Sequence, residues 1–117
     1  MPKKPNKKEE TKPVKLSAID QDIVTVLMGT ELYGLEILDK LNPDRPIPLS
    51  FGSLYPALNR LEKKGIIKWR WGDESEETGG ARRKYYKVTG LGETTLREIQ
   101  RYRTLLAQRS GQVLGGV

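Results

Sequence analysis

Polar side chains that could contact a nucleic acid are concentrated in one short segment, residues 50–63, which reads SFGSLYPALNRLEK. Leu54, Leu58 and Leu61 recur there at helical spacing, so we expect them to be buried and the polar residues to face outward. In the major groove of DNA, an amide can read adenine, and Arg or Lys can bind guanine or a phosphate. The candidate DNA contacts on this helix are Ser50, Ser53, Tyr55, Pro56, Asn59, Arg60 and Lys63. Taken alone, the pattern also fits an ordinary solvated helix face.

Two of these positions need separate comment. The hydroxyl of Tyr55 can bind a phosphate, or its ring can support the start of the helix as a half-buried aromatic residue. Glu62 would repel a phosphate, so we expect it to face away from DNA and to pair with a neighbouring cation.

A second group of cations follows in a predicted hairpin. Residues 66–71 and 82–89 have the composition of two strands, joined by an acidic turn at residues 73–80. We expect four cations to lie on one side of this hairpin, beside the helix: Arg70, Arg82, Arg83 and Lys84. The glycines before Arg82 allow a close backbone approach, and a narrow minor groove attracts inserted Arg side chains. Strand alternation places Trp69 and Trp71 together, and we expect both to pack in the core.

Several kinds of chemistry are missing. The sequence has no Cys and no His, which excludes Ser-His-Asp and Cys-His catalysis and thiol-based metal sites. The acidic run at residues 73–77 could suggest a metal or acid–base site, but its composition is typical of an exposed turn. We therefore predict that the protein is not an enzyme and has no catalytic residue, no metal site and no cofactor.

Charge and length restrict the class of protein further. The 117 residues suffice for one small domain, and 21 basic against 15 acidic residues give a net charge of +6. Most of that charge lies in residues 1–16, a Lys- and Pro-rich segment that we predict to be a disordered tail. This tail is either a solvated terminus or a basic arm that contacts phosphates. No apolar run approaches the roughly 20 residues of a membrane span, so we expect a cytoplasmic protein without a membrane partner.

The order of the predicted elements defines a fold. Helices are expected from Ser17 to about residue 28, over 32–41 and from about Ser53 to residue 64, followed by the hairpin and a helix over 91–109 that Thr89 caps. This order predicts a mainly α protein with a small β-hairpin: a winged helix-turn-helix domain over residues 17–90, a C-terminal dimerisation helix over 91–109 and a flexible tail over 110–117. The predicted dimerisation residues are Leu96, Ile99, Tyr102, Arg103 and Leu106. The alternative is that this stripe packs only on its own chain.

Three stretches resemble the PadR-like family of transcriptional regulators. Residues 32–37, LYGLEI, are similar to the family's start of the second helix, with Leu35 where an aromatic residue is usual. Residues 52–66, GSLYPALNRLEKKGI, match its longest and most specific motif, and residues 83–92, RKYYKVTGLG, match a third. The resemblance covers about residues 17–106. Residues 72–86 are also similar to a cyanobacterial member of the family that is associated with the circadian clock.

The resemblance implies a repressor that occupies a promoter as a homodimer, without an additional C-terminal helical domain. Its partner would be double-stranded DNA with a palindromic operator, and nothing in the sequence supports a small-molecule effector. The alternative function is a winged-helix module that binds a partner protein without specific DNA binding.

Overall fold

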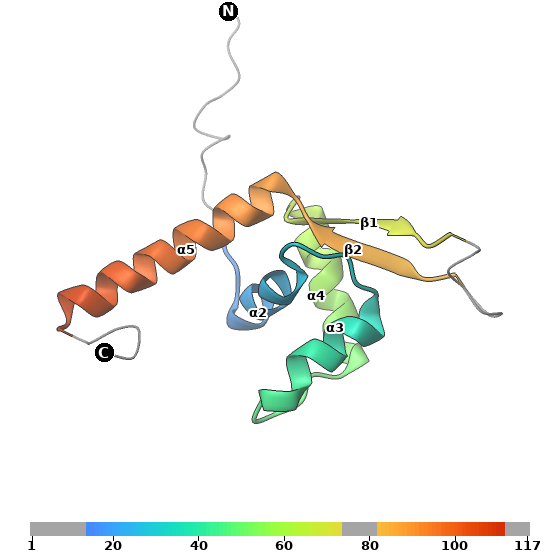
Figure 1. Cartoon of the computed structure of the whole chain (residues 1–117), viewed down its shortest axis with the longest axis horizontal. Helices are drawn as coiled ribbons and strands as arrows, with labels where there is room; N and C mark the ends of the chain where they lie inside the picture. Colours follow the sequence, from blue (N-terminus) through green and yellow to red (C-terminus); the bar gives the residue numbers. More distant parts are fainter. Residues whose placement is uncertain (1–13, 74–81, 112–117) are drawn as a thin grey trace, which may run out of the picture.

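Three helices, a two-stranded hairpin and a long last helix follow one another along the chain (Figure 1). The structure is a computed structural model that describes residues 14–73 and 82–111. Most of the predicted N-terminal tail, acidic turn and C-terminal tail lies outside these residues. The elements are α2 (Ala18–Leu27), α3 (Gly34–Leu41), the short 3-10 helix η1 (Asn42–Asp44), α4 (Phe51–Lys63), β1 (Ile67–Trp71), β2 (Lys84–Val88) and α5 (Gly90–Arg109).

Hydroxyl side chains cap the helices that the sequence marks with Ser or Thr. The Oγ atom of Ser17 accepts from the backbone N–H of Asp20 at 3.1 Å, and the Asp20 carboxylate accepts from the Ser17 N–H at 3.2 Å. Thr89 caps α5 in the same way, as predicted. The third helix begins at Phe51, two residues before the prediction, because Ser50 caps it. Pro56 therefore lies in the second turn, where its missing N–H removes one intrahelical hydrogen bond.

The second helix is shorter than the sequence suggests. Leu32 was expected to be helical, but its backbone exchanges two hydrogen bonds with Tyr86 of β2, at 3.1 and 2.8 Å. These bonds hold Leu32 in an extended conformation, so α3 begins only at Gly34. Leu35, the second residue of α3, is exposed.

The core lies where α2, α3 and α4 meet the base of the hairpin and the start of α5. Its largest fully buried aliphatic side chains are Ile23, Leu27, Ile37, Leu54, Leu58, Leu61, Ile66 and Ile67. Residues before Ser17 also belong to the folded domain, because Leu16 is buried and Val14 packs against the core. The prediction of a disordered tail over residues 1–16 is therefore wrong for residues 14–16, and residues 1–13 lie outside the described residues.

The hairpin is an antiparallel ladder that pairs Trp69 with Tyr86 and Trp71 with Lys84. Tyr86 is buried and Trp69 packs against the core, whereas Trp71 is 46% exposed. The prediction that Trp71 belongs to the core is thus wrong. The reason is that the hairpin extends outward beyond the helices, so only its base can pack on them (Figure 1).

This architecture is the winged helix-turn-helix fold predicted from the order of the elements. Helices α2, α3 and α4 form the body, the hairpin is the wing, and α5 extends away on the opposite side from the wing (Figure 1). None of the helices in residues 14–73 and 82–111 combines the length and hydrophobicity that a bilayer span requires.

Candidate nucleic-acid interface

A groove of about 590 Å³ separates α4 from the hairpin. On the helix side it is lined by Phe51, Tyr55 and Asn59, which lie four residues apart and hence on one helix face. The remaining lining residues come from the start of α3 and from the hairpin: Tyr33, Gly34, Leu35, Trp71, Arg82, Arg83, Lys84 and Tyr86. Among the described residues, three cations and no carboxylate line the groove, which favours an anionic ligand.

Aromatic rings hold the three cations of the groove. The Lys84 ammonium lies 4.1 Å from the ring centre of Trp69, and the Arg83 guanidinium lies 4.5 Å from that of Tyr33. Arg82 lies 5.6 Å from the ring centre of Trp71 and donates to the carbonyl of Gly72 at 3.2 Å. Such contacts are worth about 0.5–1 kcal/mol at exposed sites, which restrains the side chains while they keep their charge.

A stacked pair of aromatic rings lies on the helix wall of the groove. The rings of Phe51 and Tyr55 are 5.8 Å apart and nearly parallel, at 15°. The Tyr55 hydroxyl lies against Gly34, where an added Cβ would overlap it. Position 34 thus has to be glycine for this contact. The position of Tyr55 is compatible with both roles predicted for it. Its ring supports the start of α3, and 44% of the residue is exposed, so that its hydroxyl group can also bind a phosphate.

Tyr86 closes the floor of the groove. Burial raises the pKa of its phenol to about 12, and the nearby Tyr55 and Glu62 add to the rise by disfavouring a second negative charge. Tyr86 is therefore neutral over the whole physiological pH range and contributes no anion that would oppose a phosphate.

Arg60 does not belong to the groove. Its Nη2 atom donates to Oδ1 of Asp20 on α2, at 3.2 Å, and Asp20 is only 2% exposed. The sequence predicted Arg60 to face DNA, but the buried carboxylate binds the guanidinium, because a buried charge requires a partner. The pair joins α4 to the capping box of α2.

Arg70 and Glu62 also have protein partners. Arg70 makes two hydrogen bonds to the Glu31 carboxylate, at 2.9 and 3.0 Å, and lies over the ring of Tyr85. Arg70 pairs with Tyr85 whereas Lys84 pairs with Trp71, so strand alternation places Arg70 and Lys84 on opposite faces. The prediction that all four wing cations share one side is wrong for Arg70. We expected Glu62 to pair with a neighbouring cation, but its carboxylate instead accepts from the Trp69 indole N–H at 2.9 Å.

The remaining predicted contacts are on the exposed surface of α4. Ser53, Pro56 and Lys63 are exposed but do not line the groove, and Ser50 is exposed while its Oγ caps the helix. Six residues that line the groove were not predicted from the sequence: Tyr33, Gly34, Leu35, Phe51, Trp71 and Tyr86. Ser50 as an N-cap predicts that Phe51 is the first residue of the helix. Its spacing of four and eight residues from positions 55 and 59 then places it on the same helix face.

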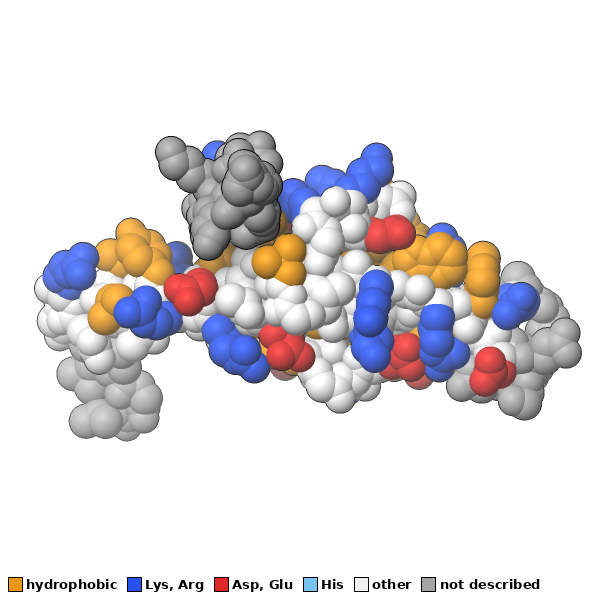
Figure 2. Space-filling model, turned by 90° about the horizontal axis from the view of Figure 1, so that it is seen from above, with side chains coloured by type: hydrophobic (Ala, Val, Ile, Leu, Met, Phe, Trp, Pro, Cys, Tyr) orange, Lys and Arg blue, Asp and Glu red, His pale blue; other side chains and the backbone are white. Residues whose placement is uncertain are grey.

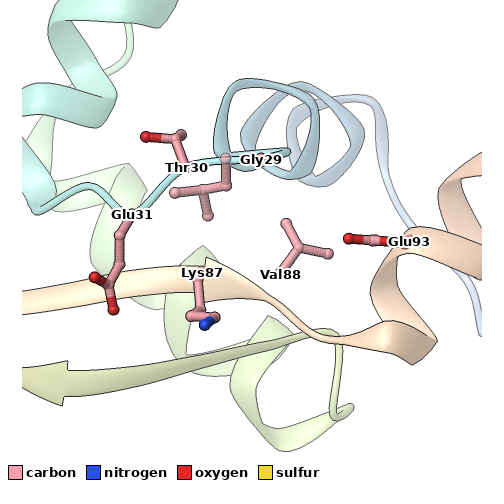
Figure 3. Close-up of a pocket in the computed structure, with 7 residues that line it drawn as sticks. Gly29, Thr30, Glu31, Lys87, Val88 and Glu93 are labelled. Carbon is pink, nitrogen blue, oxygen red and sulfur yellow. The ribbon is translucent and has the colours of Figure 1, made fainter.

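A second hollow, of about 330 Å³, lies between the turn after α2, strand β2 and the start of α5 (Figure 3). Its charged lining residues are Glu31, Lys87 and Glu93. The two carboxylates disfavour an anionic ligand, and Glu31 already binds Arg70. The groove beside α4 is therefore the better candidate for a nucleic-acid site.

The predicted dimerisation residues are divided between the core and the surface. Leu96 is 3% exposed within its own chain, and Ile99 packs against the same core. Further along α5, Tyr102 is 57% exposed, and Arg103 and Leu106 are exposed as well. Figure 2 shows apolar and basic side chains side by side on the part of α5 that extends from the body. Leu96 is thus not available to a second chain, whereas the outer half of the helix is.

Residues 23–98 match the Transcriptional regulator PadR-like family, which covers more than half of the chain. An uncharacterized protein of Lysinibacillus sphaericus is 32% identical over 83 residues, covering 69% of this chain and 73% of that one. The structure of a PadR family transcription regulator from Clostridium difficile is similar with a TM-score of 0.70 and 32% identity, covering 85% of this chain and 100% of that one. The chain therefore belongs to the PadR-like family and to a class of transcriptional regulators, not of enzymes.

The fold is also similar to that of Bacillus subtilis PadR in complex with operator DNA. The TM-score is 0.63 at 22% identity, over 74% of this chain and 48% of that one. This similarity concerns the fold alone. None of the matching proteins described above is named for a role in the circadian clock. The similarity of residues 72–86 to a clock-associated member of the family therefore gains no support.

Proposed function

We propose that this regulator binds double-stranded DNA through α4 and the hairpin, and that it represses transcription by occupying a promoter. In this arrangement α4 enters the major groove, and Arg82 and Arg83 reach the adjacent minor groove. The phosphate backbone between the two grooves lies in the channel that separates α4 from the hairpin. Such a regulator works where the DNA is, which in a bacterium is the cytoplasm.

The observation that carries this proposal is the set of charges around the groove. Among the described residues, its lining includes Arg82, Arg83 and Lys84 and no carboxylate, whereas charges of both signs lie side by side on the face of the molecule that Figure 2 shows. Asn59 lies on the same wall and presents the amide that adenine recognition requires. Bacillus subtilis PadR, which has a similar fold, binds operator DNA in its crystal structure, and this supports DNA as the partner.

We further propose that the protein acts as a homodimer through the outer half of α5. At 1.5 Å per residue, the 20 residues of α5 span about 30 Å. Leu96 and Ile99 pack in or against the core, and the helix extends away from the body (Figure 1). Tyr102, Leu105 and Leu106 are exposed apolar residues there, and a second copy of the same helix would bury them. Two-fold symmetry then places two α4 helices on half-sites about 34 Å apart, or a multiple of it, which requires a palindromic operator.

Selection of bound duplexes from random DNA tests both parts of the proposal. Purified protein should enrich a site with two inverted half-sites. A variant with both Arg82→Ala and Arg83→Ala should enrich it poorly, because the wing cations are lost. Lys87→Ala removes a cation on the opposite face of the hairpin and serves as the matched control. No enrichment by the unaltered protein would contradict DNA binding, and an asymmetric single site would contradict the dimer.

A further inference from the structure

Phe51 is an exposed aromatic residue at the first position of α4. Its side chain is apolar, yet 44% of the residue is exposed to water. The ring is also fixed in place: it stacks on Tyr55 with ring centres 5.8 Å apart, and the Tyr55 hydroxyl lies against Gly34. An exposed ring that the surrounding residues hold rigid needs little further ordering when it binds a partner.

Two charged side chains of α4 that could read a base sequence already have protein partners. Arg60 binds Asp20 and Glu62 binds the Trp69 indole, so neither is available without breaking a contact of the fold. Gly52 and Pro56 have no polar side-chain group at all. Among the described residues that line the groove, Asn59 is the one side-chain amide, and Phe51 lies two turns before it on the same face.

The major groove offers one apolar group to a protein, which is the C5-methyl group of thymine. Phenylalanine is one of the side chains that contact this group, and the N-terminal residues of a recognition helix are those that reach base edges. We propose that Phe51 is a specificity-determining residue that contacts a thymine methyl group in each half-site. This inference rests on the proposed DNA-binding function and identifies a base that the site would require.

Deoxyuridine provides a test because it lacks only the methyl group of thymine. Each thymine of a selected duplex is replaced singly by deoxyuridine, and the affinity of the protein is measured by fluorescence anisotropy. At one position in each half-site, the unaltered protein should bind about four-fold more weakly, the loss expected for one buried methyl group. Phe51→Ala should bind the thymine and deoxyuridine duplexes equally at that position. Leu91→Ala removes an exposed apolar residue of α5, outside the groove, and should keep the four-fold difference.

Two results would overturn the inference while leaving the proposed function intact. One is equal binding of all singly substituted duplexes by the unaltered protein. The other is a Phe51→Ala variant, folded by circular dichroism, that still discriminates thymine from deoxyuridine at the same position. If the unaltered protein selects no duplex at all, the proposed function is wrong and the inference falls with it.

Discussion

Replacing Arg60 by alanine should destabilise the fold, although the residue lies on the helix that we propose to enter DNA. Asp20 is 2% exposed, and its carboxylate has two partners: the Ser17 N–H at 3.2 Å and the Arg60 guanidinium at 3.2 Å. The alanine variant leaves this buried carboxylate with the Ser17 contact alone. A buried charge that has lost its partner costs about 3–5 kcal/mol, whereas an exposed pair contributes about 0.2–1 kcal/mol.

The surroundings of Arg60 and Asp20 place the expected loss of stability between the value for a buried pair and the value for an exposed pair. Because the Arg60 side chain is 51% exposed, water screens it on one side and can enter when it is removed. We therefore expect the free energy of unfolding to fall by about 2 kcal/mol, which corresponds to a loss of about 10 °C in Tm for a domain of this size. Urea and thermal denaturation followed by circular dichroism measure both quantities.

A second substitution separates the ion pair from other effects of losing Arg60. Asp20→Asn keeps an oxygen that can accept from the Ser17 N–H but removes the charge that needs Arg60. In the Arg60→Ala background it should recover part of the lost stability, since no unpaired carboxylate remains. Lys63→Ala, on the exposed surface of the same helix, should change stability by less than about 0.5 kcal/mol. Unchanged stability of Arg60→Ala together with a loss of sequence preference would refute this reasoning and return Arg60 to the base-reading role that the sequence suggested.

Four further outcomes are expected. Asn59→Ala should weaken binding to the selected duplex by about 1–3 kcal/mol and leave binding to random DNA unchanged in competition assays; equal losses on both would mean that Asn59 contacts only the backbone. Joint replacement of Arg82 and Arg83 by alanine should make the dependence of affinity on salt less steep, and an unaltered salt slope would argue that they contact no phosphate. Leu106→Glu should sediment as a monomer at micromolar concentration where the unaltered protein is a dimer; a monomeric unaltered protein would contradict the α5 interface. The unfolded Tyr86 phenol ionises near pH 10 and the folded one near pH 12, so the contribution of Tyr86 to stability should be constant below pH 10 and decline between these values, and Tyr86→Phe should remove that part of the decline.

Local signals in the sequence were sufficient to predict most of the fold. Ser17 and Thr89 marked the starts of their helices because a cap depends on residues within one turn. The leucines of α4 and the two strand-like runs gave the winged-helix order, since periodicity is also a local property. The errors at Leu32 and Leu16 arose from pairing and packing with distant residues, Tyr86 and the core, which no local pattern contains.

The candidate site was less predictable than the fold for the same reason. Tyr55, Asn59, Arg82, Arg83 and Lys84 do line one groove. Helix periodicity predicts the shared face of Tyr55 and Asn59, whereas Arg82 and Arg83 precede β2 and are not placed by strand alternation. Which cations are available to a ligand depends on partners far away in the sequence. Arg60 and Arg70 have the same chemistry as these groove cations, but buried or neighbouring carboxylates 40 and 39 residues away bind them.

Equilibrium binding to a selected duplex and to a scrambled duplex of the same composition, over a series of salt concentrations, tests the central claim most directly. If the protein is a sequence-specific DNA-binding regulator, the selected duplex should bind at least about 1,000-fold more tightly at physiological salt, and both affinities should fall linearly with the logarithm of the salt concentration. Equal affinity for the two duplexes, or affinity that does not depend on salt, would contradict the account and favour a winged-helix module that binds a protein partner.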